Sequence, residues 1–385
     1  MLYLDSAATS PVRREALEAM WPYLTGDFGN PSSHHTVGES AARGLTAARN
    51  QVAAWLGCRP GEVVFTAGGT EANNLAIKGI ALGSPRGRHL VTTAIEHEAI
   101  LESVDYLRRH HGFDVTFVPL TDDGTVTPNA LAGSLRPDTT LVSIAHANNE
   151  IGTVQPIRDL ARVATEAGVP FHSDAVQSAG WLDTRILQLG VSALSISGHK
   201  LGAPKGIGAL YVAGRLPLEP VIHGGGQERG RRSGTENVAG AVALGAVVGL
   251  AEAARLARRD GASTARDTFI ADVLGRLPEA RVTGSRTSRL PASASFVFPG
   301  TSGESVLLEL ERRGIVSSSG SACAAGSDDP SHVLTALGYA ADVAQTAVRF
   351  SWSDGVSAPE LAAVAASLEA AVLAVRGVAP GRFAE

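Results

Sequence analysis

The stretch that decides the fold class is SALSISGHKLGAPKGIGALYV, residues 192–212. Two short β-rich runs, SALSIS and GALYV, flank a glycine-rich loop that contains Lys200. Short apolar runs bounded by glycines predict buried strands. Working outward toward residue 61, we find five more runs of this kind: EVVFT, HLVTT, DVTFVPL, TLVSIA and VPFHSD.

Helical patterns separate these strand runs. Apolar residues recur at helical spacing over residues 71–82, 98–111 and 158–167. The alternation predicts an α/β fold with a seven-stranded, mainly parallel sheet covered by helices on both faces. Ligands of such sheets collect at the carboxyl ends of the strands, so polar residues at those ends are the first candidates for a functional site.

The sequence changes in character after residue 212. A glycine-rich loop, HGGGQERGRRSGT, precedes an Ala- and Val-rich helical pattern that reaches about residue 259. Strand runs ASFVF, IVSSS and VRFSW then mix with helical patterns at ESVLLELERRG and residues 359–376. We expect an N-terminal arm over 1–15, a large domain over 16–258, and a smaller α+β C-terminal domain over 259–385 that carries the Cys323 loop.

Composition argues against several classes of protein. The 385 residues include 33 Lys and Arg against 38 Asp and Glu, a formal charge of −5, so we expect no direct nucleic-acid partner. The longest uncharged apolar run, between Asn237 and Glu252, is shorter than the roughly 18 residues that span a bilayer, which predicts a buried helix and no membrane contact. The first residues, MLYLDSAATSP, do not resemble a secretory signal.

The spacing of the cysteines and histidines argues against disulfide-rich and metal-binding proteins. Cys58 and Cys323 are far apart and form neither a disulfide framework nor a CxxC motif, which favours a reducing cytoplasm. None of the 11 histidines has metal-ligand spacing, and HEAIL does not fit the HExxH pattern, so we expect no metal site.

One candidate anion site is TAGGTEANN, residues 66–74, where a strand run leads through two glycines into a helix. Free backbone N–H groups at a helix start, together with the Thr70 hydroxyl, can cradle a phosphate. The alternative is an ordinary capped helix after a tight turn. The segment contains neither a Walker loop nor GxGxxG, so a nucleotide is not indicated.

Three more residues lie at predicted strand ends. Asp174 ends VPFHSD, Lys200 follows SALSIS, and His97 follows HLVTT. Taken singly, these are most simply a helix-capping Asp, a solvated Lys and a helix-start His. Together with a phosphate cradle, however, a carboxylate facing a protonated ring nitrogen and a partly desolvated lysine match the needs of pyridoxal 5'-phosphate. An imidazole could stack on the ring and exchange protons near neutral pH.

Cys323 lies within SSSGSACAAGS, residues 317–327, among small residues. A structural cysteine usually sits in an apolar run, as Cys58 does beside Trp55 and Leu56. The surroundings of Cys323 instead suggest an exposed loop with a reactive thiol, although a chance loop cysteine is the alternative.

Ordered motifs from Tyr3 to about Ser351 resemble the NifS/IscS-type cysteine desulfurases. They are DSAATSP, GNPSSHH, FTAGGTEANNLAIKG, EHEAIL, ANNEIGTVQP, HSDAVQSAG, SGHKLGAPKGIGALYV, HGGGQERGRRSGT, SSGSAC and PSHVLTALG. The resemblance implies a fold type I pyridoxal phosphate enzyme of the class V aminotransferase group. It also implies a homodimer that takes sulfur from L-cysteine and leaves L-alanine.

The resemblance assigns roles to individual residues. Lys200 matches the lysine that holds the cofactor and removes the substrate α-proton, His97 the histidine that stacks on the ring, and Asp174 the partner of its nitrogen. Gln177 matches the residue near the phenolic oxygen. The residues that match phosphate contacts are Gly69, Thr70, Ser197, His199 and, from the neighbouring subunit, Thr235. The residues that match the substrate side are Asn149 and Arg349, with Arg349 clamping the carboxylate, while Cys323 matches the thiol that accepts sulfur as a persulfide.

The resemblance leaves the protein that receives the sulfur open. It is compatible with iron–sulfur cluster assembly, transfer-RNA thiolation and DNA phosphorothioation. Ser353 and Asp354 stand where relatives often have Gly and Arg. Two other functions remain: a lyase for cysteine or selenocysteine in which Cys323 is incidental, and a catalytically silent partner of a sulfur-transfer protein.

Overall fold

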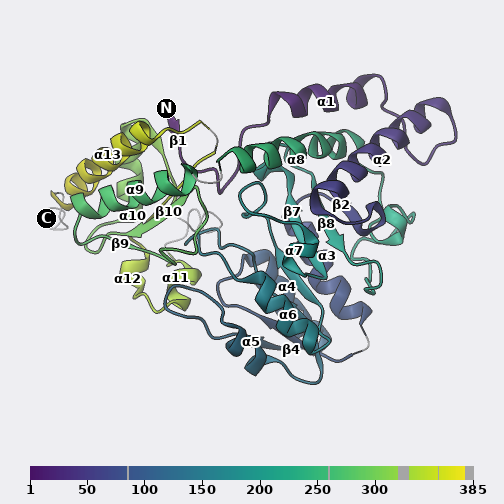
Figure 1. Ribbon diagram of the computed structural model, residues 1–385, viewed down its shortest axis with the longest axis horizontal. Coiled ribbons are helices and arrows are strands. Elements are labelled where there is room, and N and C mark those ends of the chain that lie inside the picture. The colour runs from purple at the N-terminus through teal and green to yellow at the C-terminus, as the bar shows by residue number, and fades with distance from the viewer. Residues whose placement is uncertain (85, 259–260, 320–328, 354, 378–385) are drawn as a thin grey trace, which may run out of the picture.

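The computed structural model describes residues 1–84, 86–258, 261–319, 329–353 and 355–377. Cys323 and Asp354 lie outside the described residues. The chain folds into a large lobe built on a seven-stranded sheet and a small lobe built on a three-stranded sheet (Figure 1).

All seven predicted strand runs of the large lobe form one sheet. In sheet order its strands are β2 (Val63–Thr66), β8 (Gly208–Val212), β7 (Ala193–Ser197), β6 (Phe171–Asp174), β5 (Thr139–Ser143), β3 (His89–Thr92) and β4 (Asp114–Phe117). Strand β8 is antiparallel to both of its neighbours, whereas the neighbouring pairs from β7 to β4 are parallel. The prediction of a seven-stranded, mainly parallel sheet is therefore confirmed.

Helices cover both faces of this sheet. One face packs against α3 (Gly69–Gly83) and α4 (Glu98–His111), and the other against α2 (Thr36–Leu56), α6 (Ile157–Glu166) and α8 (Val238–Arg258). Because successive strand residues point to opposite faces, Val64 and Phe65 of β2 belong to different cores. The shorter elements of this lobe are α5 (Pro128–Ser134), α7 (Ile186–Leu189), η1 (Pro60–Glu62), η2 (Gly198–Lys200) and η3 (Glu228–Gly230).

The apolar run between Asn237 and Glu252 forms most of α8, which packs between α1 (Arg14–Thr25), α2 and the sheet. Leu244 and Val247 of α8 have no exposed surface, so the expected buried helix is confirmed. By length and composition alone, α8 and α13 (Ala358–Gly377) would be long and apolar enough to cross a membrane. Each instead contributes side chains to a core of the fold.

The small lobe surrounds an antiparallel sheet in the order β12 (Ala347–Ser351), β10 (Ser293–Val297), β9 (Arg281–Val282). Phe269 contacts Phe296, Phe350 and Trp352 in T-shaped pairs with ring centroids 5.4–6.0 Å apart. The helices of this lobe are α9 (Gly261–Arg276), α10 (Gly303–Arg312), α11 (His332–Ala336), α12 (Ala341–Ala344) and α13.

The predicted strand IVSSS is shorter than expected. Only β11 (Ile315–Val316) is a strand, and it pairs in parallel with β1 (Leu2–Tyr3). The following serines lack apolar side chains to bury, and Ser318 makes a single bridge to Arg349. This bridge places the start of the Cys323 segment beside β12.

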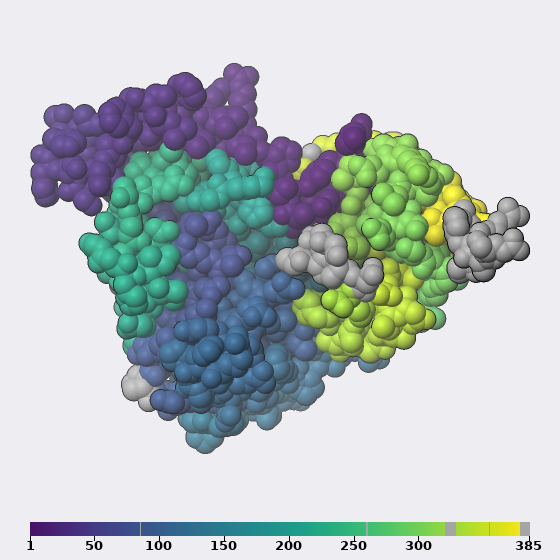
Figure 2. All heavy atoms as spheres, turned by 180° about the vertical axis from the view of Figure 1, so that it is seen from behind, coloured from purple at the N-terminus to yellow at the C-terminus, as the bar shows by residue number. Residues whose placement is uncertain are grey.

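The N-terminal segment connects the two lobes. Leu4 lies in the small-lobe core, and the backbone N–H of Ser6 donates to the Ser351 carbonyl at 3.0 Å. Further along, the N–H of Arg13 donates to Gly202 in the large lobe at 2.8 Å. Figure 2 shows this segment in purple between the lobes. Residues 1–13 therefore pass close to the carboxyl ends of β6 and β7.

Candidate active site

A cavity of about 440 Å³ lies where the carboxyl ends of the parallel strands meet the small lobe. Ten residues singled out from the sequence line it: Gly69, Thr70, His97, Asn149, Asp174, Gln177, Ser197, His199, Lys200 and Arg349. These residues come from the ends of strands β6 and β7, the start of α3, η2 and the connecting loops of the large lobe, and from β12 of the small lobe. The fold thus brings together chemical groups that are up to 280 positions apart in the chain.

Asp174 is the last residue of β6, and its side chain is buried. Its Oδ1 accepts a 2.8 Å hydrogen bond from the backbone of Val176, and its Oδ2 accepts one of 2.6 Å from the side-chain amide of Asn73. Burial raises the pKa of Asp174, while these hydrogen bonds and the positive groups of His97 and Lys200 oppose the rise. A carboxylate held this way would be stabilised by a cationic group in the cavity.

The anion side of the cavity begins at α3, a 15-residue helix that starts at Gly69. A Cβ at Gly69 would lie 2.7 Å from Val176 Cγ2 and 3.3 Å from Ser197 Cβ, so only glycine allows this close approach. Thr70 and Ser197 line the cavity beside it. A helix N-terminus flanked by two hydroxyl groups is a suitable cradle for a phosphate.

His199 extends this cradle from η2. Its Nδ1 lies 3.0 Å from the hydroxyl oxygen of Thr9. Burial, together with nearby Lys200 and Lys205, lowers the pKa of His199 to about 4. The imidazole is therefore neutral at physiological pH and can serve as a hydrogen-bond donor without adding a charge.

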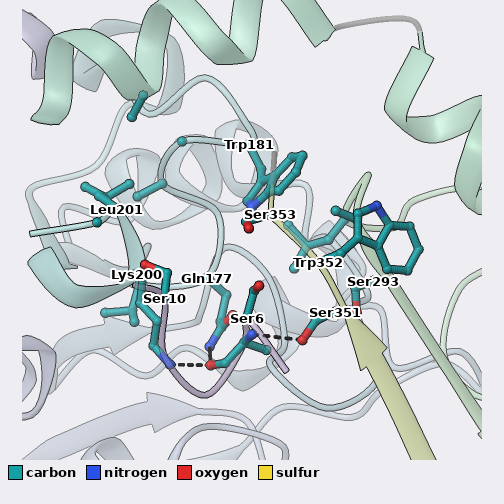
Figure 3. A pocket seen from close by; sticks show the side chains of 18 of the residues that line it. Ser6, Ser10, Gln177, Trp181, Lys200, Leu201, Ser293, Ser351, Trp352 and Ser353 are labelled. Carbon is teal, nitrogen blue, oxygen red and sulfur yellow. Dashed lines mark hydrogen bonds between the residues drawn. The ribbon is translucent and has the colours of Figure 1, made fainter. Parts of the chain in front are cut away.

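Lys200 reaches the N-terminal segment. Its Nζ donates to the carbonyl of Ala7 and to that of Ala8, the latter at 2.7 Å. Gln177 Nε2 donates to the same Ala7 carbonyl at 3.0 Å. Figure 3 shows both side chains pointing toward this carbonyl from one wall of a second cavity, of about 290 Å³. Lys200 lines both cavities, so its amine lies at their boundary.

His97 is the N-cap of α4, and its Nδ1 accepts a 3.0 Å hydrogen bond from the backbone of Ala99. This bond fixes the ring relative to the helix. His97 lines the same cavity as Lys200 and Asp174. The sequence-based interpretations of His97 as a helix-start residue and as a site residue are thus compatible.

Arg349 enters the cavity from β12 and is only 1% exposed. Its Nη2 forms a 2.7 Å ion pair with Asp5, and its Nη1 donates to the Asn149 carbonyl at 2.9 Å. A guanidinium in a cavity wall can bind a carboxylate through two parallel hydrogen bonds.

Two predicted site residues are not placed in this cavity. Thr235 is exposed and lines a separate hollow of about 100 Å³ beside Arg232 and Asn237. Cys323 lies outside the described residues, so the structure does not place its thiol. The described residues on either side of its segment, Ser318 and Asp329, lie next to Arg349 and along the cavity wall, respectively.

Four contributors to the site were not predicted from the sequence. Asn73 holds Asp174, Asp5 pairs with Arg349, and the carbonyls of Ala7 and Ala8 receive Lys200. Asn73 and Asp5 lie within TAGGTEANN and DSAATSP, two of the segments quoted above, so their polar side chains were available as a signal. Backbone carbonyls carry no comparable signal.

A further missed group ties the end of the Cys323 segment to the large lobe. Ser331 Oγ donates to Glu150 at 2.5 Å, and His332 Nε2 lies 3.0 Å from the Glu96 carbonyl. Glu150 lines the cavity, and burial raises its pKa. These contacts anchor the start of α11 at the cavity mouth.

The donor set fits pyridoxal phosphate. A buried carboxylate, a phosphate cradle that excludes a Cβ, and a primary amine line one cavity of suitable size. The structure offers residues for the ring nitrogen, the phosphate and a covalent link to an aldehyde, which are the three anchors that this cofactor needs.

Comparisons with known proteins agree with this arrangement. Residues 2–360 match the model of the family described as aminotransferase class-V. The chain is 44% identical to the cysteine desulfurase IscS of Dictyoglomus turgidum over 91% of this chain and 89% of that protein.

Solved structures give the same result. A NifS-like protein has a TM-score of 0.89 at 34% identity, with 97% of this chain and 99% of that chain covered. A structure described as SspA in complex with cysteine has a TM-score of 0.79 at 38% identity, with 91% and 98% covered.

Proposed function

The chain belongs to the class-V aminotransferase family, and on this premise we propose that it is a pyridoxal-phosphate-dependent cysteine desulfurase. It takes sulfur from L-cysteine and releases L-alanine. The observation that carries the proposal is that Lys200, Asp174 and Arg349 line one cavity with a phosphate cradle. The similarity to proteins named cysteine desulfurase selects this reaction among those of the family.

We assign the cofactor to residues of the large lobe. Lys200 would supply the amine for the covalent link, and Asp174 would pair with the ring nitrogen. His97 would stack on the ring, and Gln177 would lie near the phenolic oxygen. Gly69, Thr70, Ser197 and His199 would hold the phosphate. When bound, the cofactor supplies an electron-withdrawing ring that stabilises negative charge at the substrate α-carbon.

Substrate recognition falls to the small-lobe side of the cavity. Arg349 binds the carboxylate of L-cysteine, and Asn149, whose carbonyl already holds Arg349, borders the same space. Lys200 lies at the boundary of the cavity, where its amine can remove the proton from the substrate α-carbon. Asp174, which is buried, would stabilise a cationic ring nitrogen of the bound cofactor and so favour this proton transfer.

Cys323 accepts the sulfur atom of the substrate. Its thiolate attacks the substrate sulfur, so that a sulfur–sulfur bond forms as the carbon–sulfur bond breaks. The electron pair of the broken bond stays with the carbon that becomes the methyl group of L-alanine. The persulfide then passes its outer sulfur to an acceptor protein that serves iron–sulfur cluster assembly, transfer-RNA thiolation or DNA phosphorothioation. We place this thiol chemistry in the reducing cytoplasm.

We further propose that the enzyme is a homodimer. Thr235 is exposed and lies away from the cavity of its own chain, which suits a residue that reaches the phosphate of a second copy. An exposed apolar stripe runs along α1 and just beyond it; its members are Leu17, Trp21, Leu24 and Phe28, which are 52–69% exposed. An apolar stripe of this kind marks a surface for association.

The test incubates the cofactor-loaded protein with L-cysteine. We expect equal amounts of L-alanine and of sulfur, with the sulfur first found as a persulfide on Cys323. Production of pyruvate, or the absence of both L-alanine and persulfide, would exclude the proposed reaction.

A further inference from the structure

We propose that Asp5 is a positioning residue for substrate recognition: it holds the guanidinium of Arg349 in the orientation that binds the substrate carboxylate. This inference rests on the proposed function, because it concerns how the same cavity recognises an amino acid. It makes the N-terminal segment part of the substrate site.

The two side chains form a close pair that other groups shield from solvent. Asp5 Oδ1 lies 2.7 Å from Arg349 Nη2, and the side chains are 18% and 2% exposed, respectively. Arg349 lines the Lys200 cavity, whereas Asp5 is not among the lining residues of that cavity. The carboxylate therefore binds the guanidinium from outside the space that the substrate would fill.

A second hydrogen bond holds the other terminal nitrogen of the Arg349 guanidinium. The carbonyl of Asn149 accepts a 2.9 Å hydrogen bond from Arg349 Nη1. One terminal nitrogen is thus bound by Asp5 and the other by Asn149, which together define the plane of the guanidinium. Its remaining N–H directions are then also defined, as a bidentate clamp on a carboxylate requires.

Asp5 is itself held in register with Arg349. Asp5 bridges in parallel to Ser351, two residues beyond Arg349 on β12. The N–H of Ser351 donates to the Leu4 carbonyl at 2.8 Å, and the N–H of Ala7 donates to Ser351 Oγ at 2.8 Å. Backbone hydrogen bonds on both sides of Asp5 therefore fix the carboxylate beside the guanidinium.

The energetic reason for such a pair is preorganisation. A buried guanidinium without a counter-ion is costly, and a long unheld side chain loses rotamer freedom when it binds a ligand. Asp5 balances the charge and fixes the rotamer before the substrate arrives. Loss of Asp5 should therefore weaken the binding of ligands that carry a carboxylate more than that of ligands without one.

The experiment titrates the cofactor-loaded enzyme with L-alanine and with L-alaninamide, which lacks the carboxylate, and follows the cofactor absorbance. Asp5→Ala should raise the dissociation constant of L-alanine at least tenfold and that of L-alaninamide less than twofold. Asp5→Asn keeps an oxygen acceptor for Arg349 but not the negative charge, and should recover only part of the L-alanine affinity. With L-cysteine as substrate, Asp5→Ala should raise KM and change kcat less than threefold.

Tyr3→Phe is the matched control, because the Tyr3 hydroxyl donates to the backbone carbonyls of Asp5 and Thr9, so its loss leaves the Asp5 carboxylate in place. This variant should bind both ligands as the wild type does. Unchanged L-alanine binding in Asp5→Ala, or an equal loss for both ligands, would overturn the inference. A wild-type enzyme that binds neither ligand would instead contradict the proposed function.

Discussion

The side-chain amide of Asn73 donates a 2.6 Å hydrogen bond to the carboxylate of Asp174. The contact joins the first turns of α3 to the end of β6, across 101 positions of sequence. Both side chains are buried, so the bond is protected from water. The phosphate cradle and the carboxylate of the site are therefore held at a fixed separation by one amide.

Replacing Asn73 tests this link. Asn73→Ala removes the donor to a buried carboxylate, which should lower the free energy of unfolding by about 1–3 kcal/mol. Asn74→Ala is the matched control, because Asn74 is the next residue on α3 and contacts Thr70 and Lys78 rather than Asp174. Denaturant unfolding of the two variants measures the effect. An equal decrease in the free energy of unfolding in both variants would show that the contact with Asp174 does not stabilise the fold.

Glu96 should make stability depend on pH. This carboxyl group is buried beside the site, where it accepts hydrogen bonds from Thr93 and Ala145, and burial raises its pKa to about 8 from an ordinary 4.5. The folded protein therefore keeps a proton that the unfolded chain loses above pH 4.5. The contribution of Glu96 to stability is fully present below that pH and is lost as the pH rises to about 8.

The Glu96→Gln variant carries a neutral amide that cannot ionise, so it should not lose stability in this way as the pH rises. Between pH 4.5 and about 8, the free energy of unfolding of the variant should rise relative to that of the wild type by about 1.4 kcal/mol for each pH unit. The measurement is the free energy of unfolding at pH 5, 6, 7 and 8. Glu102→Gln, at an exposed position of α4, is the control and should follow the wild-type curve. A constant difference between Glu96→Gln and the wild type at all pH values would contradict the prediction.

Arg349 should govern substrate affinity rather than cofactor affinity. Arg349→Ala removes the carboxylate clamp, and we expect KM for L-cysteine to rise about 100-fold, or roughly 3 kcal/mol. The dissociation constant of pyridoxal phosphate should change less than threefold. The variant also leaves Asp5 without its ion pair, so Arg349→Lys, which keeps a cation, controls for stability. Equal losses of substrate and cofactor binding would refute the assigned role.

Cys323 decides between a desulfurase and a lyase. Cys323→Ala should abolish the protein persulfide and reduce L-alanine formation at least 100-fold. Cys58→Ala is the natural control, because burial raises the pKa of the Cys58 thiol to about 12 and leaves it unreactive. Sulfide release from L-cysteine that persists in Cys323→Ala would favour the lyase.

Much of the large lobe could be predicted from the sequence, because six of its seven strands are short runs buried on both faces; the exception is the edge strand β4. Val64 and Leu210 have no exposed surface, and each lies in a run bounded by glycine or polar residues. Helices α1 and α2 were not predicted. Helix α1 contains Pro22 and exposes Trp21, so its apolar residues do not mark a buried face.

The site was predictable in part for a similar reason. Asp174 and Lys200 follow recognisable strands, and the topology of a parallel sheet brings such ends together. The Asp5–Arg349 pair spans 344 positions and depends on how the small lobe folds onto the N-terminal segment, which no local pattern encodes. The roles of the Ala7 and Ala8 carbonyls depend on backbone position alone.

The central claim is that the amine of Lys200 carries the cofactor. The chain contains only three lysines, Lys78, Lys200 and Lys205, so the two others are internal controls. Reduction of the pyridoxal-phosphate-loaded protein with borohydride, followed by peptide mass spectrometry, should find the phosphopyridoxyl mass on Lys200 alone. An unmodified Lys200, or equal labelling of all three lysines, would contradict the account.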